Sequence, residues 1–485
     1  MRRKFDKYVF KTEPYDHQRS VFRDSWHREC YALFMEMGTG KSKIVVDTIA
    51  LLQEVGEIDT VLIVAPKGVF HNWVRKEIPA HLPDRIEHSI CAWQPNITQK
   101  YRDEFQAFIN SDKLKIFVMN VEAFSTSKGA ETAAWFAKKF GEKGMMVVDE
   151  STAIKNRKAN RTKAIVAAGK FFTYKRLLTG SPVTKSPMDL FSQCLFLGDN
   201  YLGYPNYYAF QGRYAVVQRR SMGHRSFQQI VGFQRLDELN LKLDDFSSRV
   251  LKKECLDLPE KVYIRREVEL TSEQKKLYRQ MSKLALAELQ DGSLVSTNNV
   301  LTQIMRLQQI CCGHVKDDQG FLIDIDNNRL DELLNICEET SGKVIIWANW
   351  VHDIVNIDEA LAIRFGQKTV QSYYGSTEAS TRQNVVEEFQ NPDSPMRFFV
   401  GNSRTGGMGI TLTEASTVIY YSNNYDLEIR VQSEDRAHRI GQKNNVTYID
   451  LVSPRTIDEK ILTALQNKQN IASTVLGEEL REWFQ

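Results

Sequence analysis

The stretch FMEMGTGKSKIVVDTIALLQ (residues 34–53) holds the signal that decides the fold of the first part of the chain. The run CYALF (30–34) before it predicts a buried strand. After the glycines, Val45, Ile49 and Leu52 fall on one helical face. A strand, a glycine-rich turn and a helix in this order form the context in which a chain wraps around phosphate groups.

The turn itself carries the groups that a triphosphate needs. Gly38, Thr39 and Gly40 form the loop, and its glycines let the backbone approach phosphate closely at the helix N-terminus. Lys41 can reach the β- and γ-phosphates, and Ser42 can bind Mg²⁺. The turn therefore predicts a site for a triphosphate with Mg²⁺.

One residue of the turn departs from the general motif G-x-x-x-x-G-K-[ST]. Met35 stands where that motif has its first glycine. Two interpretations follow from the residues alone: a triphosphate site with a different opening, or a chance glycine turn with a surface lysine. The rest of the sequence has to decide between them.

A pair of carboxylates ends another apolar run, MMVVDE (145–150). Asp149 is suited to hold Mg²⁺ through water, and Glu150 is suited to polarise an attacking water as a general base. Taken alone, such a pair is more often a solvated strand end. Its place about a hundred residues after the lysine suits a nucleotide-binding domain with a parallel sheet, so the two motifs together favour the catalytic interpretation.

Continuous apolar runs predict two parallel α/β domains, because strands buried on both faces lack polar alternation. The runs of the first domain are 61–66, 115–122, 145–150 and 176–181, and those of the second are 343–350, 397–402, 417–422 and 446–452. Residues 265–340 show helical spacing and no strand run, which predicts a helical protrusion. We place the boundary near DLPEK (257–261), giving domains 1–258 and 259–485.

The segment QSEDRAHRIGQ (432–442) predicts a short helix that ends at Gly441. On such a helix Gln432, Arg436 and Arg439 share one face. Neighbouring arginines repel, and a γ-phosphate facing them would remove that cost and be stabilised during transfer. The alternative is a solvated helix with Asp435 paired to Arg439.

Composition limits the class of protein. The 485 residues are too many for one core, and a net charge of +3 leaves nucleic-acid binding to local basic patches. The seven cysteines are irregularly spaced, which indicates a reduced cytoplasmic protein and makes a zinc site at CCGH (311–314) improbable. We find no signal peptide, no membrane span and no internal repeat, and expect a monomer.

At this point the motifs are numerous enough to compare with a family. From about residue 14 to 461 the chain resembles the Swi/Snf-like ATPases of helicase superfamily two, a group that includes chromatin remodellers and double-stranded DNA translocases. The resemblance rests on PYDHQ, MEMGTGKS, VLIVAPKGVFHNWVRKE, DESTAIKN, LLTGSPVTKSPMDLFSQCLFL, RLQQICCGH, SRTGGMGITLTEAS and QSEDRAHRIGQ. The segment DRAHRIGQ is the most specific of these.

The resemblance implies a fold and several roles. It implies two RecA-like lobes with helical insertions and a site for ATP and Mg²⁺ that uses residues of both lobes. By the same resemblance Gln18 contacts adenine, and Thr179 and Ser181 belong to a motif that couples hydrolysis to movement. Met35 is normal for this family, which resolves the ambiguity of the glycine turn.

Two positions depart from the family pattern. Thr152 stands where the family usually has a histidine that links the acidic pair to the coupling motif, so coupling is expected to differ in detail. In Ser403–Arg404–Thr405, the third residue replaces the smaller alanine that is often found there. We expect no effect of this second change on the fold.

A motor of this family needs a nucleic-acid track. Lys155, Arg157 and Lys158 begin a basic run (155–163) that contains no acid, and a second basic cluster lies at 218–225. Without context, a solvated face is the default for such runs. The resemblance implies that they grip the phosphate backbone, with Arg404 and Thr411 as the candidates in the second lobe. No aromatic platform for single-stranded bases stands out, which favours duplex DNA.

Three functions are therefore compared. The favoured one is an ATP-driven translocase on double-stranded DNA that remodels DNA or displaces bound proteins. The second is a helicase that separates strands of DNA or RNA with the same site residues. The third is a scaffold that binds nucleotide without hydrolysing it, which the intact Lys41, Asp149, Glu150, Arg436 and Arg439 disfavour.

Overall fold

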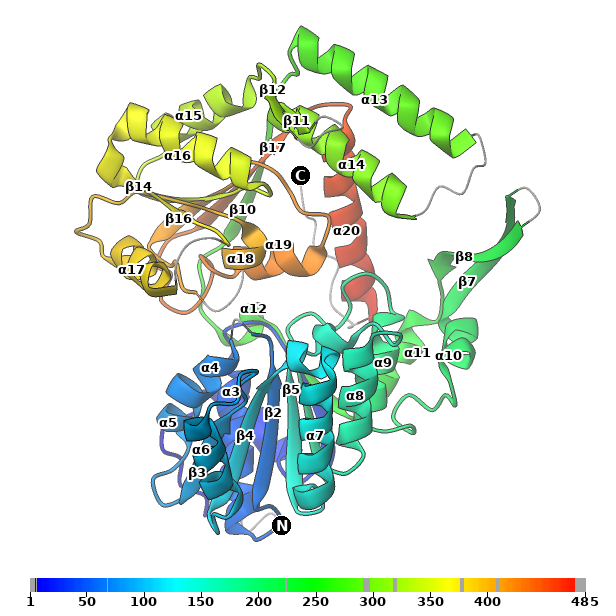
Figure 1. Cartoon of the computed structure of the whole chain (residues 1–485), viewed down its shortest axis with the longest axis vertical. Helices are drawn as coiled ribbons and strands as arrows, with labels where there is room; N and C mark the ends of the chain where they lie inside the picture. Colours follow the sequence, from blue (N-terminus) through cyan, green and yellow to red (C-terminus); the bar gives the residue numbers. More distant parts are fainter. Residues whose placement is uncertain are drawn as a thin grey trace. The chain divides into compact units, whose positions relative to one another are not determined.

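The computed structural model describes residues 5, 7–67, 69–222, 225–290, 297–316, 321–375, 379–406 and 410–475. The chain forms two compact units, which consist mainly of Met1–Val217 with Ile230–Asp257 and of Leu258–Asn470. Each unit is built around its own sheet (Figure 1).

The sheet of the first unit has seven strands in the order β3-β4-β2-β5-β6-β1-β9, and every neighbouring pair is parallel. The strands are β1 (Cys30–Met35), β2 (Thr60–Ala65), β3 (His88–Ala92), β4 (Leu114–Asn120), β5 (Gly144–Asp149), β6 (Tyr174–Leu178) and β9 (Ser247–Val250). The predicted apolar runs are therefore confirmed as central strands. The two edge strands, β3 and β9, were not predicted because they are short and partly exposed.

Helices cover both faces of this sheet. They are α2 (Asp16–Ser25), α3 (Lys41–Glu54), α4 (Phe70–Asn72), α5 (Ile78–His81), α6 (Gln99–Ile109), α7 (Ser127–Phe140), α8 (Asn160–Gly169), α9 (Asp189–Leu197), α10 (Tyr207–Tyr214), α11 (Leu236–Asp244) and α12 (Lys252–Cys255). A hairpin of β7 (Ala215–Met222) and β8 (Arg225–Phe233) forms a separate two-stranded sheet.

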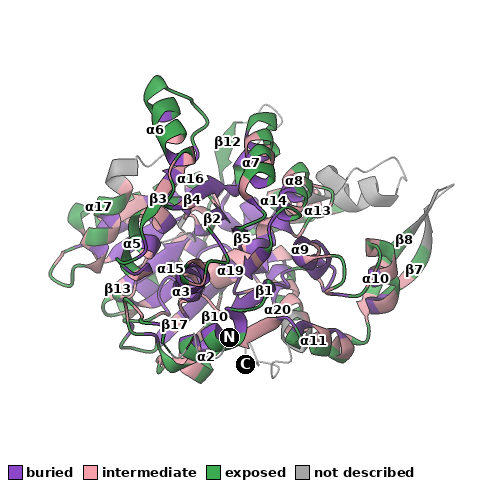
Figure 2. Cartoon of the chain, turned by 90° about the horizontal axis from the view of Figure 1, so that it is seen from below, coloured by how far each residue is buried: buried purple, intermediate pink, exposed green. Residues whose placement is uncertain are grey.

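The core of the first unit has two layers, one on each side of the sheet. Successive residues of β2 point to opposite faces, so Leu62 packs in one layer and Ile63 in the other. Phe136 of α7 belongs to the first layer, and Ile49 of α3 to the second. Figure 2 shows β2, β4 and β5 in the buried colour, as expected for strands covered on both faces.

The second unit has a six-stranded parallel sheet in the order β10-β17-β16-β13-β15-β14. Its strands are β10 (Lys261–Glu267), β13 (Lys343–Trp347), β14 (Val370–Tyr373), β15 (Phe398–Gly401), β16 (Ala415–Tyr420) and β17 (Val446–Val452). The four predicted strands and the α/β class of both units are confirmed. Residues 265–340 were predicted without strands, and this is wrong at three places: β10 extends to Glu267, and β11 (His314–Lys316) pairs with β12 (Leu322–Asp324).

Strand β10 was not predicted from the sequence, and its composition explains why. It is an edge strand with charged residues at several positions and no buried residue. Edge strands need little apolar surface, so the apolar run that marks a central strand is missing.

The helices of the second unit include the two that the sequence predicts between the sheets. They are α13 (Ser272–Gln290), α14 (Thr297–Cys312), α15 (Arg329–Glu339), α16 (Val351–Phe365), α17 (Ala379–Gln390), α18 (Ser403–Gly406), α19 (Leu427–Glu434) and α20 (Ile457–Val475). Helices α13 and α14 pack against one another (Figure 1). Within the described residues, no helix combines the length and the apolar character that a bilayer crossing requires.

A buried charge network ties α19 to the second sheet. The guanidinium of Arg430 donates to Asp450 Oδ1 at 2.5 Å and to Glu434 Oε1 at 2.8 Å, and it lies 3.6 Å from the ring centroid of Tyr420. Lys261 of β10 donates to the other carboxylate oxygen of Glu434 at 3.0 Å. Burial by itself would raise the pKa of Glu434, but Lys261 and Arg430 outweigh it and lower the pKa. The network therefore fixes the start of the segment that follows α19.

We predict that Arg430→Ala strongly destabilises the second unit. Removing the guanidinium leaves two buried carboxylates without their shared partner, a loss that costs about 3–5 kcal/mol for buried ion pairs. Urea denaturation followed by circular dichroism measures the change in the free energy of unfolding. The matched control is Arg364→Ala, because Arg364 pairs with Glu338 on the exposed surface, where pairs contribute little. Equal effects of the two substitutions would contradict the assignment of the network.

Candidate nucleotide site and basic surface

The glycine turn after β1 adopts the conformation that its glycines allow. Gly38 and Gly40 have φ values of 82° and 84°, in the left-handed region that side chains disfavour. Helix α3 begins directly after the turn, at Lys41, so its first backbone N–H groups face the loop. Such an arrangement attracts anions through both the N–H groups and the helix dipole.

The side chain of Lys41 lies over this turn. It is 9% exposed, and its Nζ donates to Met35 O at 2.9 Å and to Glu36 O at 3.3 Å. Both of these acceptors are neutral carbonyls, so they orient the ammonium without cancelling its charge. The ammonium is therefore held over the glycine turn, and its contact with phosphate stays a prediction. Ser42 follows it in the first turn of α3.

The predicted adenine-contacting glutamine is attached to the same turn. Gln18 Nε2 donates to Thr39 O at 3.1 Å, and Gln18 Oε1 accepts the Tyr15 N–H at 3.1 Å. The ring of His17, which the sequence analysis missed, has Nε2 at 2.8 Å from the same Thr39 carbonyl. The start of α2 and the glycine turn are thus held together, although contact with a base stays a prediction.

The acidic pair lies at the end of β5, where the carboxylate of Asp149 has two donors. Trp73 Nε1 donates to Oδ2 at 2.9 Å, and the Glu150 N–H donates to Oδ1 at 3.0 Å. Burial raises the pKa of Asp149, while the Trp73 hydrogen bond and the charge of Lys41 act in the opposite direction. Lys41 and Asp149 are therefore near enough for their charges to interact, and their binding of one nucleotide stays a prediction.

Glu150 has an unusual backbone conformation. Its φ of 48° and ψ of 61° are left-handed, which costs a non-glycine residue about 1–2 kcal/mol. Residues in such conformations concentrate at functional sites. Glu150 is half-buried directly after Asp149, and its role as a general base stays a prediction.

The predicted coupling motif contacts the glycine turn through its backbone. The Thr179 N–H donates to Leu33 O at 3.2 Å, and Thr179 Oγ1 accepts the Ser181 N–H at 3.1 Å. Between them Gly180 lies so near the turn that a Cβ atom there would be 3.2 Å from the Met37 nitrogen. Thr179 and Ser181 therefore shape a segment that lies against the turn, and their role in coupling stays a prediction.

A side-chain bridge joins the acidic-pair loop to this segment. Ser151 Oγ donates to Gln193 Oε1 at 2.7 Å, and Gln193 Nε2 donates to Pro182 O at 2.7 Å. All three side chains of Ser151, Thr152 and Gln193 are buried. The chain thus has a direct link between the two motifs, although Thr152 replaces the usual histidine of the resembled family. The sequence alone could not identify it, because Gln193 lies on a helix whose packing had to be known.

Arg249 on the edge strand β9 is a further residue that sequence reasoning missed. Its Nη1 donates to Phe34 O at 2.8 Å and to Gly180 O at 3.0 Å. Three residues later, the Lys252 N–H donates to Glu36 Oε2 at 2.7 Å. These bonds hold the end of β1 and the coupling segment in place from the strand that precedes the second unit. The role of Arg249 could not be predicted from the sequence, because its contacts depend on the pairing of β9 with β1.

In the second unit the arginine segment differs from the prediction. Helix α19 ends at Glu434, so Gln432 is helical but Arg436 and Arg439 lie in turns, and the helix predicted to reach Gly441 is wrong. The Tyr448 hydroxyl donates to the Glu434 carbonyl at 2.9 Å, so a residue of β17 shares this carbonyl with the His438 N–H at the point where the helix ends.

The two arginines nevertheless converge. Arg436 Nη1 donates to Ile410 O at 3.1 Å, and Arg439 Nη1 donates to the same oxygen at 3.4 Å. Arg436 Nε also donates to Gln432 O at 3.0 Å, so the three predicted residues form one cluster. Both guanidinium groups therefore lie beside residues 410–412.

The predicted nucleic-acid residues of the first unit differ in exposure. Lys155 is half-buried and donates to Thr184 Oγ1 at 2.8 Å, whereas Lys158 is exposed. Arg157 lies 4.2 Å from the ring centroid of Tyr207 and 5.2 Å from that of Tyr208. Tyr208 is 69% exposed, so an aromatic surface that the sequence analysis did not find lies beside the basic run.

The candidates of the second unit flank a short undescribed segment. Arg404 is exposed on α18, and its N–H donates to Asn402 Oδ1 at 2.9 Å. Thr411 is half-buried, and residues 407–409 lie outside the described part. The second basic cluster (218–225) is described only in part: residues 223 and 224 lie outside, as do the side chains of Arg220 and Arg225.

Comparison with known proteins gives two family models. Residues 17–315 match the SNF2-related domain, and residues 326–441 match the helicase conserved C-terminal domain. Among similar proteins are the "Probable ATP-dependent DNA helicase CHR12" of Arabidopsis thaliana, 27% identical over 457 residues, and the "Uncharacterized ATP-dependent helicase MG018" of Mycoplasma genitalium, 26% identical over 458 residues.

These alignments cover nearly all of this chain but less than half of each relative. The alignments include 91% and 92% of this chain but only 39% and 40% of the relatives, so the chain spans about two fifths of their length. A solved structure, the Sulfolobus solfataricus SWI2/SNF2 ATPase core in complex with dsDNA, is 22% identical with a TM-score of 0.43, and the match covers 96% of this chain and 94% of that one.

We predict that Gly40→Ala destabilises the first unit more than Gly56→Ala does. Both glycines have φ near 80°, at 84° and 80°, so both substitutions carry the same backbone strain of about 1 kcal/mol. A Cβ at Gly40 would lie 2.1 Å from Gln18 Nε2, whereas nothing lies within 4 Å of one at Gly56. Displacing Gln18 breaks its bond to Thr39 O and adds about 1 kcal/mol.

Urea denaturation of both variants measures the difference directly. Gly56→Ala is the control that isolates the contact with Gln18 from the backbone strain. A smaller loss of unfolding free energy at Gly40 than at Gly56 would show that the glycine turn is not held against α2.

Proposed function

This chain belongs to the family of the SNF2-related domain, and we propose that it is an ATP-driven motor that moves along double-stranded DNA. In this proposal the two units are RecA-like lobes that both act on one ATP molecule with Mg²⁺. Its movement on DNA would remodel the duplex or displace bound proteins. We further propose that it works as a monomer in the cytoplasm.

The observation that carries the proposal is the arrangement of Lys41 and Asp149. The ammonium lies over a glycine turn at the N-terminus of α3, and its charge acts on a carboxylate that a tryptophan N–H holds at the end of β5. A cation and a carboxylate at the edge of a parallel sheet are the groups that phosphoryl transfer requires. The converging arginines of the second unit support it from a separate part of the chain.

Each residue of the first unit has a proposed role. The glycine turn of Gly38, Thr39 and Gly40 would surround the phosphates with backbone N–H groups, and Lys41 would contact the β- and γ-phosphates. Gln18, fixed to Thr39, would contact the adenine.

Two side chains of the first unit offer oxygen atoms that could bind a metal ion. The hydroxyl of Ser42 and the carboxylate of Asp149 fit Mg²⁺, which takes one or two protein oxygens together with phosphates and water. When bound there, Mg²⁺ would neutralise charge on the phosphates. Glu150 would accept a proton from the attacking water.

The second unit would supply the positive charge for the transferred phosphoryl group. Arg436 and Arg439 are held close together by their bonds to Ile410 O, and an anion bound beside them would relieve the repulsion between their charges. Gln432 would orient the water or the phosphate beside them. An arginine in this role contributes roughly 10³–10⁵ to the rate.

The proposed track is duplex DNA, held through its backbone. The exposed Lys158 and Arg404, with Lys155, Arg157 and Thr411, would contact phosphates without regard to sequence. Both relatives described above are named as ATP-dependent helicases, one of them for DNA, which supports nucleic acid as the partner.

The second candidate function is strand separation. The exposed Tyr208 and the half-buried Tyr207 lie beside Arg157, and aromatic rings of this kind can stack with unpaired bases, which favours a helicase on single strands. The strained backbone of Glu150 disfavours the third function, a scaffold that does not hydrolyse ATP, because such a scaffold has no need of a general base.

We predict that duplex DNA stimulates ATP hydrolysis more than single-stranded DNA or RNA does. The motor cycle requires a track on which both lobes bind, so hydrolysis should be slow without it. Phosphate release measured with no nucleic acid, single-stranded DNA, duplex DNA and RNA tests this. Lys41→Ala should abolish the activity, whereas the exposed Lys143→Ala should retain it.

Two results would contradict the proposal. Equal rates under all four conditions would remove the DNA dependence. Greatest stimulation by single strands, together with separation of a forked duplex, would favour the helicase instead.

A further inference from the structure

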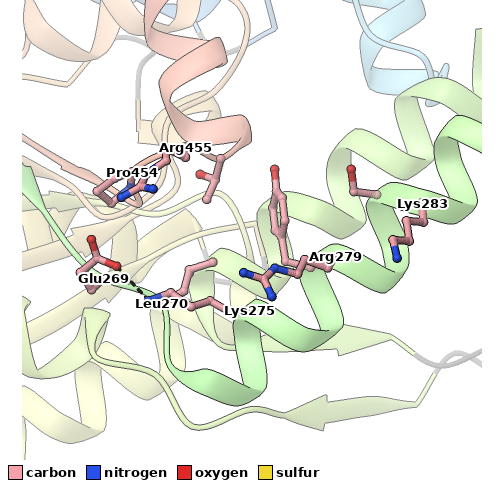
Figure 3. A pocket seen from close by; sticks show the side chains of 10 residues that line it. Glu269, Leu270, Lys275, Arg279, Lys283, Pro454 and Arg455 are labelled. Atoms are coloured by element: carbon pink, nitrogen blue, oxygen red, sulfur yellow. Dashed lines mark hydrogen bonds and ion pairs between the residues drawn. The ribbon is translucent and has the colours of Figure 1, made fainter.

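The second unit contains a pocket that none of the proposed ATP or DNA residues lines. It lies between the first turns of α13 and the loop that precedes α20, and it has a volume of about 490 Å³ (Figure 3). Its lining includes four basic side chains, from Lys275, Arg279, Lys283 and Arg455, and one acidic side chain, from Glu269. The pocket is therefore strongly positive.

Three of the cations form a ladder along α13. Lys275, Arg279 and Lys283 are spaced four residues apart, so they lie on one face of the helix and span about 12 Å along its axis. Like charges at this spacing destabilise a helix. Glu269 forms an ion pair with only the first of the three, Lys275, with 3.0 Å between its carboxylate and Lys275 Nζ. Among the described residues, no ion pair engages the side chain of Arg279 or Lys283.

The opposite wall presents the fourth cation from a constrained loop. Arg455 has a φ of 60°, which is unfavourable for a residue with a side chain. The conformation is held from both sides: the Arg455 N–H donates to Glu459 Oε2 at 2.8 Å, and Thr456 Oγ1 donates to Ser453 O at 2.7 Å. The loop thus holds a strained arginine at the rim of the pocket.

Both walls are joined by hydrogen bonds that make the pocket rigid. The Ile457 N–H at the start of α20 donates to the Tyr278 hydroxyl of α13 at 2.8 Å. Gln274 Nε2 donates to Ile310 O at 2.7 Å and so anchors the first turn of α13 to α14. The basic side chains therefore extend from a fixed frame, which lowers the entropy cost of binding an anion between them.

We propose that this pocket binds phosphate groups, at least two from one ligand. Two arginines and two lysines offer many donors and a charge that one or two carboxylates would leave unbalanced, whereas each phosphate brings more negative charge and more acceptor oxygens. The hydroxyls of Ser282 and Thr456 line the same pocket and can donate to those oxygens. The phosphates could come from a free oligophosphate or from the backbone of nucleic acid.

The test uses the full chain with Lys41→Ala, so that the glycine turn does not contribute phosphate binding. Sodium tripolyphosphate is titrated by calorimetry, and a short duplex DNA by fluorescence anisotropy. Arg279→Gln and Arg455→Gln are compared with Lys276→Gln, which removes the same charge from an exposed neighbour on α13 outside the pocket. Unfolding midpoints show that the variants are folded.

We expect each pocket variant to weaken binding by about tenfold, the effect of one charged hydrogen bond, and Lys276→Gln to have little effect. Loss of tripolyphosphate binding alone assigns the site to free oligophosphates, and loss of duplex binding assigns it to the nucleic-acid backbone. The proposal would be overturned if Lys276→Gln weakened binding as much as the pocket variants do, or if the pocket variants bound both probes as tightly as the parent chain. It would also be overturned if the pocket variants lost affinity for an oligoglutamate peptide to the same extent. None of these outcomes depends on ATP hydrolysis, so the motor proposal is tested separately.

Discussion

Parallel pairing of β1, β5 and β6 is the constraint on which the first site depends. Since the carboxyl ends of parallel strands meet at one edge of a sheet, the glycine turn, the acidic pair and the coupling motif become neighbours although they are far apart in sequence. The Thr179 N–H bond to Leu33 O and the influence of Lys41 on Asp149 are direct results of this pairing. Any change that shifted the register of β6 against β1 would separate the motifs.

Two kinds of support hold that edge in place. Trp73 fixes the carboxylate of Asp149 from one side, and Arg249 joins the ends of β1 and β6 from the other. The Ser151–Gln193 bridge connects the acidic pair to the coupling segment, so replacement of the usual histidine by Thr152 leaves the two motifs joined. The proposed motor would need such connections, because a change at the phosphate must reach segments that do not contact it.

The sequence predicted what depends on local pattern and missed what depends on pairing. Central strands such as β2 and β5 were found because burial on both faces demands continuous apolar residues. The edge strands β9 and β10 carry charges and were not found, so Arg249 was missed as well. The helix predicted around Arg436 instead ends at Glu434, where Arg430, Lys261 and Tyr263 hold the Glu434 side chain against the second sheet, and such contacts with other strands are not visible in a local pattern. Arg436 and Arg439 nevertheless donate to one carbonyl oxygen, that of Ile410.

The central claim is that one ATP molecule is hydrolysed by groups from both units, and Arg439→Ala tests it most directly. Steady-state hydrolysis with saturating duplex DNA is measured beside equilibrium binding of a non-hydrolysable ATP analogue. The account predicts that hydrolysis falls by about 10³ or more while the analogue still binds to the turn around Lys41. Retention of near wild-type hydrolysis by Arg439→Ala would contradict it, since the second unit would then contribute no charge to the reaction.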